Sequence, residues 1–283
     1  MSLEVITYHS VIEFLSIYQH LIESTACSNQ IFIEMLHESI VQTARDSLMF
    51  GAVHADHDVL LIFYNDYPYN LYLVGFDDST ACYDCLIDYL IKHQIQMKSL
   101  NAPKQEAHLF MEAYSKQSHR ELKVETVMNV MQLKEVTSSS FPTGTFVQAT
   151  INHLEIVSTF YQQFVQEVLG HDADIEKVRR KMLHKIKNGH CYVFENGNKE
   201  VVSTAHFDAV IADGISISGV YTPMPYRGQG FAIALMSHLS QLALDQGYAF
   251  CTLMVDQTRP IAQHVYEKIG YQLIDENVYY RLK

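Results

Sequence analysis

The sequence predicts a mixed α/β protein built from two domains. Runs with strand and helix character follow one another in a similar order in each half of the 283-residue chain. Between the halves, the segment 137–144 is small and polar and is broken by Pro142 and Gly144, a composition typical of a connection between domains. We therefore expect domains over residues 1–140 and 141–283, with a long loop inside one domain as the alternative.

The first half begins with two predicted helices. Apolar spacing predicts helices over 9–24 and 28–48. Their core candidates are Ile12, Leu15, Ile17, Leu21, Ile31, Met35 and Ile40. Strands are expected at 59–64, 71–74 and 122–130, and helices from the turn 75–80 to Ile91 and over 104–116.

The second half repeats this order. Strands are expected at 146–151, 191–196, 201–211, 215–222, 248–255, 271–275 and 278–282, and helices at 152–169, 173–188, 230–246 and 260–269. An apolar stripe on helix 230–246 predicts that it packs on a sheet. The stripe comprises Phe231, Leu235, Leu239 and Leu242, whereas Ser237, Gln241 and Asp245 lie away from it.

The composition narrows the class of protein. The net charge of −12 disfavours general nucleic-acid binding, because that affinity comes largely from neutralised phosphates. Residues 1–141 carry 8 Lys and Arg against 18 Asp and Glu, whereas residues 142–283 carry 12 against 14. No window approaches the ~20 apolar residues of a membrane span, and five cysteines in a long chain favour a reducing compartment. We expect a cytoplasmic protein with no membrane or nucleic-acid partner; the sequence leaves its oligomeric state open.

Two groups of ligand-type side chains are interpreted as structural. Cys82 and Cys85 have redox or zinc spacing, but no second pair lies at a zinc-module distance, so we expect buried thiols. The stretch 54–58, His-Ala-Asp-His-Asp, precedes a strand without a visible third ligand and is interpreted as a polar turn. No metal site is expected.

The stretch 221–232 has the features of an anion-binding turn. Gly228 and Gly230 allow a tight turn with no Cβ to hold a ligand away, and the next residues open a helix whose first N–H groups lack partners. Such a helix start binds phosphates, and Arg227 adds a positive charge. An isolated G-x-G is more often a plain loop, but the preceding strand and the following helix favour the binding interpretation.

Two motifs in this half resemble the GNAT superfamily of acyl-CoA-dependent N-acetyltransferases. Arg227-Gly228-Gln229-Gly230-Phe231-Ala232 is similar to the family's (Q/R)-x-x-G-x-(G/A) motif. The stretch 262–271 is similar to the family's later A-x-x-(aliphatic)-Y-x-K-x-G-(aromatic) segment, in which Tyr266 takes the place of the tyrosine. The resemblance implies mixed, mostly antiparallel central sheets flanked by helices, and acetyl-CoA as the acyl donor. One departure is Arg259, where the family often has Asn.

The resemblance also implies roles for individual residues. Backbone groups of Val220, Tyr221 and Thr222 would hold the pantetheine arm, and amides from Gly228 to Ile233, with Arg227, would bind the pyrophosphate. Those amides belong to Gly228, Gln229, Gly230, Phe231, Ala232 and Ile233. Tyr266 would act as general acid toward the leaving thiolate; the alternative is a core aromatic on a helix whose Ile261, Val265 and Ile269 face inward.

The first half resembles a degenerate second copy. Its counterpart of the turn is 75–80, where Asp77 and Asp78 are good helix caps but repel a pyrophosphate. We therefore expect a single acyl-CoA site, in the second half.

The sequence leaves the general base and the acceptor open. His206, Asp208 and Asp256 are candidates for the base, each more easily explained as structural. Cys191 and Cys251 lie within predicted strands without a partner base, which favours direct attack by a primary amine over an acyl-enzyme. The acidic first half favours a cationic small-molecule or peptide acceptor. The rival hypothesis is a catalytically silent acyl-CoA-binding or regulatory module; a nucleotide-binding P-loop is disfavoured because the Gly-Lys-Ser/Thr ending is missing.

Overall fold

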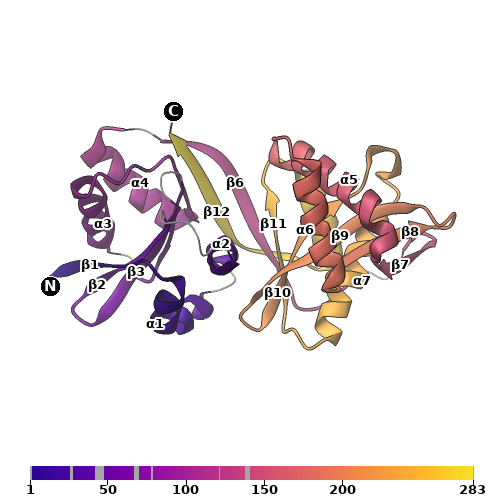
Figure 1. Cartoon of the computed structure of the whole chain (residues 1–283), viewed down its shortest axis with the longest axis horizontal. Coiled ribbons are helices and arrows are strands. Elements are labelled where there is room, and N and C mark those ends of the chain that lie inside the picture. Colours follow the sequence, from indigo (N-terminus) through magenta and orange to yellow (C-terminus); the bar gives the residue numbers. More distant parts are fainter. Residues whose placement is uncertain are drawn as a thin grey trace. The chain divides into compact units, whose positions relative to one another are not determined.

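The computed structural model describes residues 2–25, 28–41, 48–66, 70–77, 79–120, 122–137 and 141–282. By contacts between residues, the chain divides into a first unit of 1–130 with 274–283 and a second unit of 131–273 (Figure 1). This division differs from the predicted boundary after residue 140, and it assigns the last ten residues to the first unit. That the second domain carries the acyl-CoA site and that the first is a degenerate copy of it stay predictions.

The first unit is a sheet covered by four helices. Its elements are β1 (Leu3–Tyr8), α1 (Val11–Ser24), α2 (Gln30–Val41), β2 (Leu48–Ala55), β3 (Asp58–Asp66), β4 (Asn70–Gly75), α3 (Ala81–Lys92), β5 (Ser99–Pro103), α4 (Lys104–Ser118) and most of β6 (Leu122–Leu133). The strands follow the order β1-β2-β3-β4-β5-β12, where β12 is Gln272–Leu282. Neighbours pair antiparallel except β4 and β5, which are parallel. A core between the sheet and α3 and α4 includes Leu73, Leu86 and Phe110.

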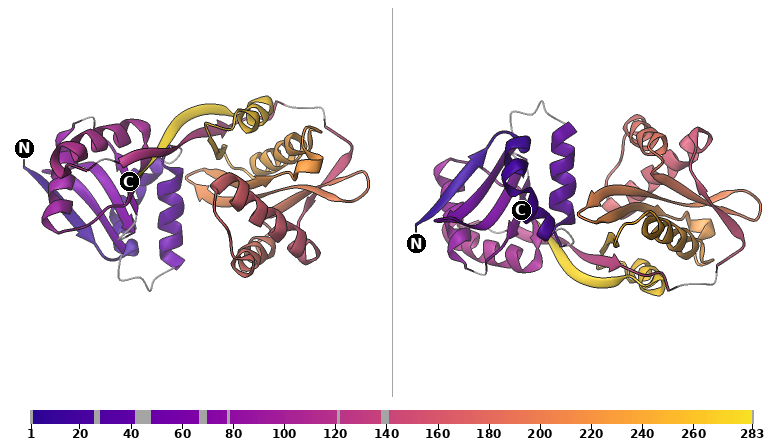
Figure 2. Two further views of the ribbon diagram at one scale, coloured as in Figure 1. Left: turned by 90° about the horizontal axis from the view of Figure 1, so that it is seen from above. Right: turned by 90° about the horizontal axis from the view of Figure 1, so that it is seen from below.

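The second unit has helices on both faces of its sheet. Its elements are β7 (Gly144–Gln148), a 3-10 turn (Ile151–His153), α5 (Leu154–Phe164), a π-helical turn (Val165–Leu169), α6 (Ile175–Lys187), β8 (Cys191–Asn196), β9 (Val201–Ile211), β10 (Gly214–Tyr221), a 3-10 turn (Met224–Tyr226), α7 (Phe231–Asp245), β11 (Cys251–Asp256) and α8 (Pro260–Ile269). Figure 2 shows α5 and α6 on one side of the strands and α7 on the other.

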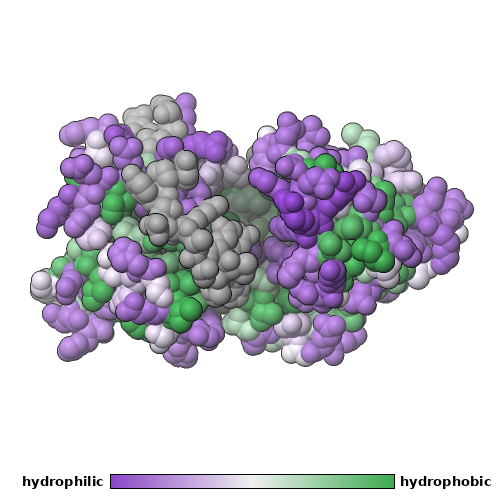
Figure 3. Space-filling view, in the orientation of Figure 1, coloured by the Kyte–Doolittle hydropathy of each residue, from purple (hydrophilic) through white to green (hydrophobic). Residues whose placement is uncertain are grey.

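Alternation along β8 explains these two layers. Cys191 and Val193 pack in the cluster of α5 and α6, whereas Tyr192 and Phe194 pack in the cluster of α7. The outer side of α6 is hydrophilic in the space-filling view (Figure 3), because its exposed positions include several Lys and Arg residues. The fold class predicted from the sequence, a mixed and mostly antiparallel sheet flanked by helices, is confirmed.

The two units repeat one order of elements. Each repeat runs strand, two helices, three strands, helix, strand, helix, strand, from β1 to β6 and from β7 to β12. The last strands are exchanged: β12 of the second repeat pairs with β5, through registers such as Val278 with Ala102, and β6 of the first repeat neighbours β11. This exchange places residues 274–283 in the first unit.

Several expectations for individual elements were wrong. In α1 the buried residues are Val11, Phe14, Tyr18 and Ile22. Ile12 and Ile17, proposed for the core, are 69% and 54% exposed, because the periodic stripe starts one residue earlier. The sequence missed β1, β2 and β5, and the two predicted closing strands form the single strand β12. The expected helix over 28–48 is described only to residue 41, and Leu48 begins β2. On α7, Ser237 is buried rather than solvated. In the described part of the chain, no helix is long and apolar enough to cross a membrane.

Candidate active site

A split between β10 and β11 opens the second unit at the carboxyl ends of these strands. The two strands pair in parallel at Ile215–Cys251 and Ser216–Thr252, near the start of each strand, and no further pair follows among the described residues. On its other side, β10 loses register with β9 between Ser218 and Tyr221. Gly219, inside that bulge, has a φ of +63°, which favours glycine. Open α/β sheets bind ligands beyond the carboxyl ends of their strands.

The far end of β10 is held by side chains from neighbouring elements. The carbonyl of Tyr221 accepts a hydrogen bond from Ser203 Oγ at 3.2 Å, and the carbonyl of Thr222 accepts one from Arg227 Nε at 2.8 Å. Each carbonyl keeps a second lone pair. No hydrogen bond from a described residue engages Thr222 N–H or Val220 N–H across the split. The three residues predicted to hold a pantetheine arm therefore border the split with acceptor and donor groups.

The turn after β10 has the backbone geometry of an anion site. Gly228 and Gly230 have φ values of +74° and +84°, and Gly230 caps α7 without a side-chain hydrogen bond. The amides of residues 228–233 donate to no carbonyl or side chain of the described chain, whereas Ala234 N–H begins the helical pattern by donating to the Gly230 carbonyl. A Cβ added at Gly228 would meet no atom within 4 Å. These unpaired N–H groups at a helix start suit a phosphate.

Arg227 does not point freely at this turn. Its Nη2 donates to Glu167 Oε2 at 2.7 Å, and its guanidinium lies 5.6 Å from the centre of the Tyr221 ring. Glu167 Oε2 also accepts a hydrogen bond from the Tyr221 hydroxyl at 3.2 Å, and the carbonyl of Glu167 accepts one from Arg259 Nη2. The hydrogen bond from Arg227 lowers the pKa of Glu167, so the carboxylate is ionised at neutral pH. No local pattern pointed to Glu167, which lies in the helix predicted over 152–169.

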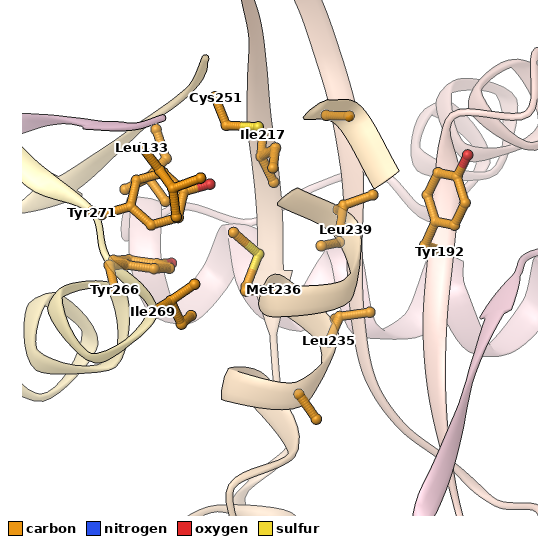
Figure 4. Packing of buried hydrophobic residues seen from close by; sticks show 14 of the residues in the cluster. Leu133, Tyr192, Ile217, Leu235, Met236, Leu239, Cys251, Tyr266, Ile269 and Tyr271 are labelled. Atoms are coloured by element: carbon orange, nitrogen blue, oxygen red, sulfur yellow. The ribbon is translucent and has the colours of Figure 1, made fainter. Parts of the chain in front are cut away.

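Tyr266 lies at the edge of the core on α8. Its ring is 8% exposed and packs edge-on against Tyr271, with a centroid distance of 5.9 Å. Figure 4 shows it beside Ile269 and Tyr271, with Met236 of α7 nearby. Burial raises the pKa of Tyr266, and its hydroxyl makes no hydrogen bond with a described residue. The expectation that Ile261 also faces inward was wrong, because Ile261 is 83% exposed.

The three candidate bases are all engaged structurally. His206 is fully enclosed, with a ring so close to Gly219 that an added Cβ would lie 2.4 Å from its Cε1. Burial lowers the pKa of His206 to about 3, so it is neutral at pH 7. Burial alone would raise the pKa of Asp208, but the Lys185 ammonium, 2.6 Å from its Oδ1, holds it below the usual range. Asp256 Oδ1 accepts hydrogen bonds from the N–H and hydroxyl of Thr258.

The matching place in the first unit is filled. A Cβ on Gly75, at the end of β4, would lie 2.8 Å from the Tyr83 hydroxyl and 3.0 Å from Glu106 Cγ. Asp77 accepts a hydrogen bond from Ser79 N–H at 2.7 Å, within the turn, but α3 is capped at Thr80 without a side-chain hydrogen bond, so the expectation that Asp77 caps this helix was wrong. Asp78 lies outside the described residues. Nearby, Cys82 is a buried free thiol and Cys85 a partly buried one. This arrangement leaves less room for a ligand than the turn at Gly228.

Comparison with known proteins identifies the second unit. The model of the acetyltransferase (GNAT) family matches residues 154–271, which include the split, the turn and Tyr266. Residues 154–271 form a GNAT-family domain. The match to this family supports acyl transfer as the general type of reaction. No curated protein matches the chain.

Solved structures extend the likeness to the whole chain. A GNAT-family acetyltransferase from Colwellia psychrerythraea matches with a TM-score of 0.64 and 14% identity, over 99% of this chain and 100% of that one. A GCN5-related N-acetyltransferase from Sphaerobacter thermophilus gives 0.66 and 15%, over 98% and 95%. A tandem GNAT protein from the clavulanic acid biosynthesis pathway gives 0.56 and 10%, over 99% and 98%. At these identities the likeness shows the fold, and it confirms the predicted tandem of GNAT-like halves.

Proposed function

We propose that the protein is an N-acetyltransferase that transfers an acetyl group from acetyl-CoA to a primary amine. The observation that carries this proposal is the set of unpaired amides at residues 228–233, directly beyond the split of β10 and β11 in a GNAT-family domain. We assign the pyrophosphate to these amides and to Arg227. The pantetheine arm lies along Val220, Tyr221 and Thr222, as an added strand at the free edge of β10.

The amine attacks the thioester carbon directly. The nitrogen lone pair forms the new C–N bond, the C–S bond breaks, the nitrogen loses a proton and the leaving thiolate gains one. An acyl-enzyme is disfavoured because burial raises the pKa of Cys191 to about 11 and that of Cys251 to about 12, which keeps both as thiols at pH 7. Positioning of the thioester and the amine supplies most of the acceleration.

Tyr266 serves the leaving group. Its raised pKa keeps the phenol protonated, and its hydroxyl has no hydrogen-bond partner in the described chain that would compete for the proton. A buried hydroxyl that donates to a developing thiolate stabilises the transition state more than the ground state. We further infer a cationic small-molecule or peptide acceptor and a cytoplasmic setting, from the acidic first half and the sparse cysteines.

The second candidate is a catalytically silent acyl-CoA-binding module. It is favoured by one observation: each candidate base is already engaged. His206 is buried, Asp208 is paired with Lys185, and Asp256 accepts hydrogen bonds from Thr258 within the turn after β11.

An amine-panel assay that follows thiol release from acetyl-CoA separates the two candidates. The enzyme hypothesis predicts turnover with at least one amine and a drop in kcat of about 100-fold in Tyr266→Phe, with unchanged affinity for acetyl-CoA. Tight CoA binding without turnover on any amine would establish the module instead. An acetylated cysteine trapped after incubation with acetyl-CoA alone would contradict direct attack.

A further inference from the structure

We propose that Glu167 is a carboxylate latch on the donor site: in the free protein it holds Arg227, and the donor's pyrophosphate must take Arg227 from it. This inference rests on the proposed function, because it assumes that the anion at residues 228–233 belongs to a CoA donor. It assigns a role in donor binding to a residue of the connection between α5 and α6.

Glu167 contacts both sides of the split between β10 and β11. Its carboxylate binds Arg227 of the turn and the Tyr221 hydroxyl at the end of β10. Its backbone carbonyl binds Arg259, which caps α8 just after β11. One residue of the π-helical turn Val165–Leu169 thus ties together the two strand ends between which a pantetheine arm has to pass.

The charges at these contacts indicate that Glu167 weakens, rather than strengthens, binding of the pyrophosphate. Arg227 immediately precedes the free amides, but its guanidinium is used by Glu167 and by the Thr222 carbonyl. A pyrophosphate on those amides brings at least two negative charges next to an ionised carboxylate, so the two anions compete for one guanidinium. A residue that favoured binding of acyl-CoA would present a hydrogen-bond donor or a positive charge to the phosphates, whereas Glu167 presents a second anion.

The local backbone allows the carboxylate to leave. π-helical turns are rare and often occur at functional sites. This one ends at Gly170, whose φ is +73° and around which an added Cβ would meet no atom within 4 Å. The side chains of Glu167 and Arg227 are 40% and 36% exposed, so water and salt partly screen the ion pair. Breaking it therefore costs a ligand little of its binding free energy.

The test is calorimetric binding of CoA to the full chain and to Glu167→Gln. The amide keeps the shape of Glu167 but removes its charge. We expect the Kd for CoA to fall about three- to fivefold, the range for a partly exposed ion pair. In an Arg227→Gln background the gain should be smaller, because the contested guanidinium is gone and only the repulsion between the carboxylate and the phosphates remains. Glu176→Gln is the matched control, since it breaks an exposed ion pair with Arg179 on α6, and it should leave the Kd unchanged.

The outcomes separate this inference from the function on which it rests. Equal or weaker binding of CoA by Glu167→Gln would overturn the latch while leaving the donor assignment intact. A gain that persists undiminished in the Arg227→Gln background would also overturn it, because the competition would then not be for Arg227. If neither the wild type nor any variant bound CoA, the donor assignment itself would fail, and the latch with it.

Discussion

Replacing Gly228 by alanine tests the anion-binding turn with a single methyl group. Gly228 has a φ of +74°, a conformation that costs an L-residue about 1–2 kcal/mol. The methyl itself meets nothing within 4 Å in the protein, so strain in the backbone is the only expected penalty to the free state. For a unit of this size, each kcal/mol lowers Tm by roughly 2–4 °C.

The effect on the donor should be much larger than the effect on stability. The methyl occupies the space in which a phosphate approaches the amides of Gly228 and its neighbours, and each hydrogen bond to a charged group contributes about 1.5–3 kcal/mol. Loss of one such bond raises the Kd for CoA roughly 10- to 100-fold. Isothermal titration with CoA and a thermal melt on the same preparation measure both quantities.

Gly247→Ala is the matched control for Gly228→Ala. Gly247 follows the other end of α7, has a φ of +96°, and also has no atom within 4 Å of an added Cβ. It should lower Tm to a similar extent and leave the Kd for CoA unchanged. If Gly228→Ala bound CoA as tightly as the wild type while showing the expected drop in Tm, the assignment of the pyrophosphate to this turn would be refuted.

Three further predictions concern the core beneath the site. The pKa of His206 is about 3 in the folded protein and about 6.5 in the unfolded chain, so its contribution to stability is complete above pH 6.5 and is lost as the pH falls towards 3. Urea unfolding at pH 7, 5.5 and 4 should show this fall in the free energy of unfolding, and the fall should be smaller in His206→Gln. Titration of His206 near pH 6.5, followed by NMR, would contradict it. Lys185→Met leaves the Asp208 carboxylate without its partner and should lower the free energy of unfolding in urea by about 3 kcal/mol, much of it recovered when Asp208→Asn is added. Equal losses in the single and the double variant would show that the unpaired Asp208 charge is not the source of the cost. Cys191 and Cys251 should resist a disulfide reagent at pH 8 until the protein unfolds, and rapid labelling of either in the native state would show that the thiol is not buried.

Local sequence signals predicted the elements around the site well. The stripe of Phe231, Leu235 and Leu239 is buried as expected, because a helix on a sheet shows its period directly in the sequence. The two glycines before α7 have the positive φ that their type and spacing suggested. Burial of Ser216, Ser237 and Thr252 went unpredicted, since a polar side chain inside a core breaks the hydrophobic pattern from which burial is inferred.

Other features depend on contacts that a local pattern does not contain. The strand β2 was missed partly because Gly51 weakens its strand signal. The glycine is explained by its neighbours in the sheet, since an added Cβ would lie 2.4 Å from the Phe63 ring and 2.8 Å from the Ile6 carbonyl. The exchange of β6 and β12 between the units depends on which strands pair, and two short strands were predicted where one long strand runs. Glu167 acquires its place through Arg227 and Arg259, residues that are 60 and 92 positions away in the chain.

The central claim is that this chain has one acyl-CoA site and that it lies in the second unit. Equilibrium titration of the full chain with acetyl-CoA tests it most directly. We predict one site per chain, abolished or strongly weakened by Gly228→Ala. Two sites per chain, or none, would contradict it.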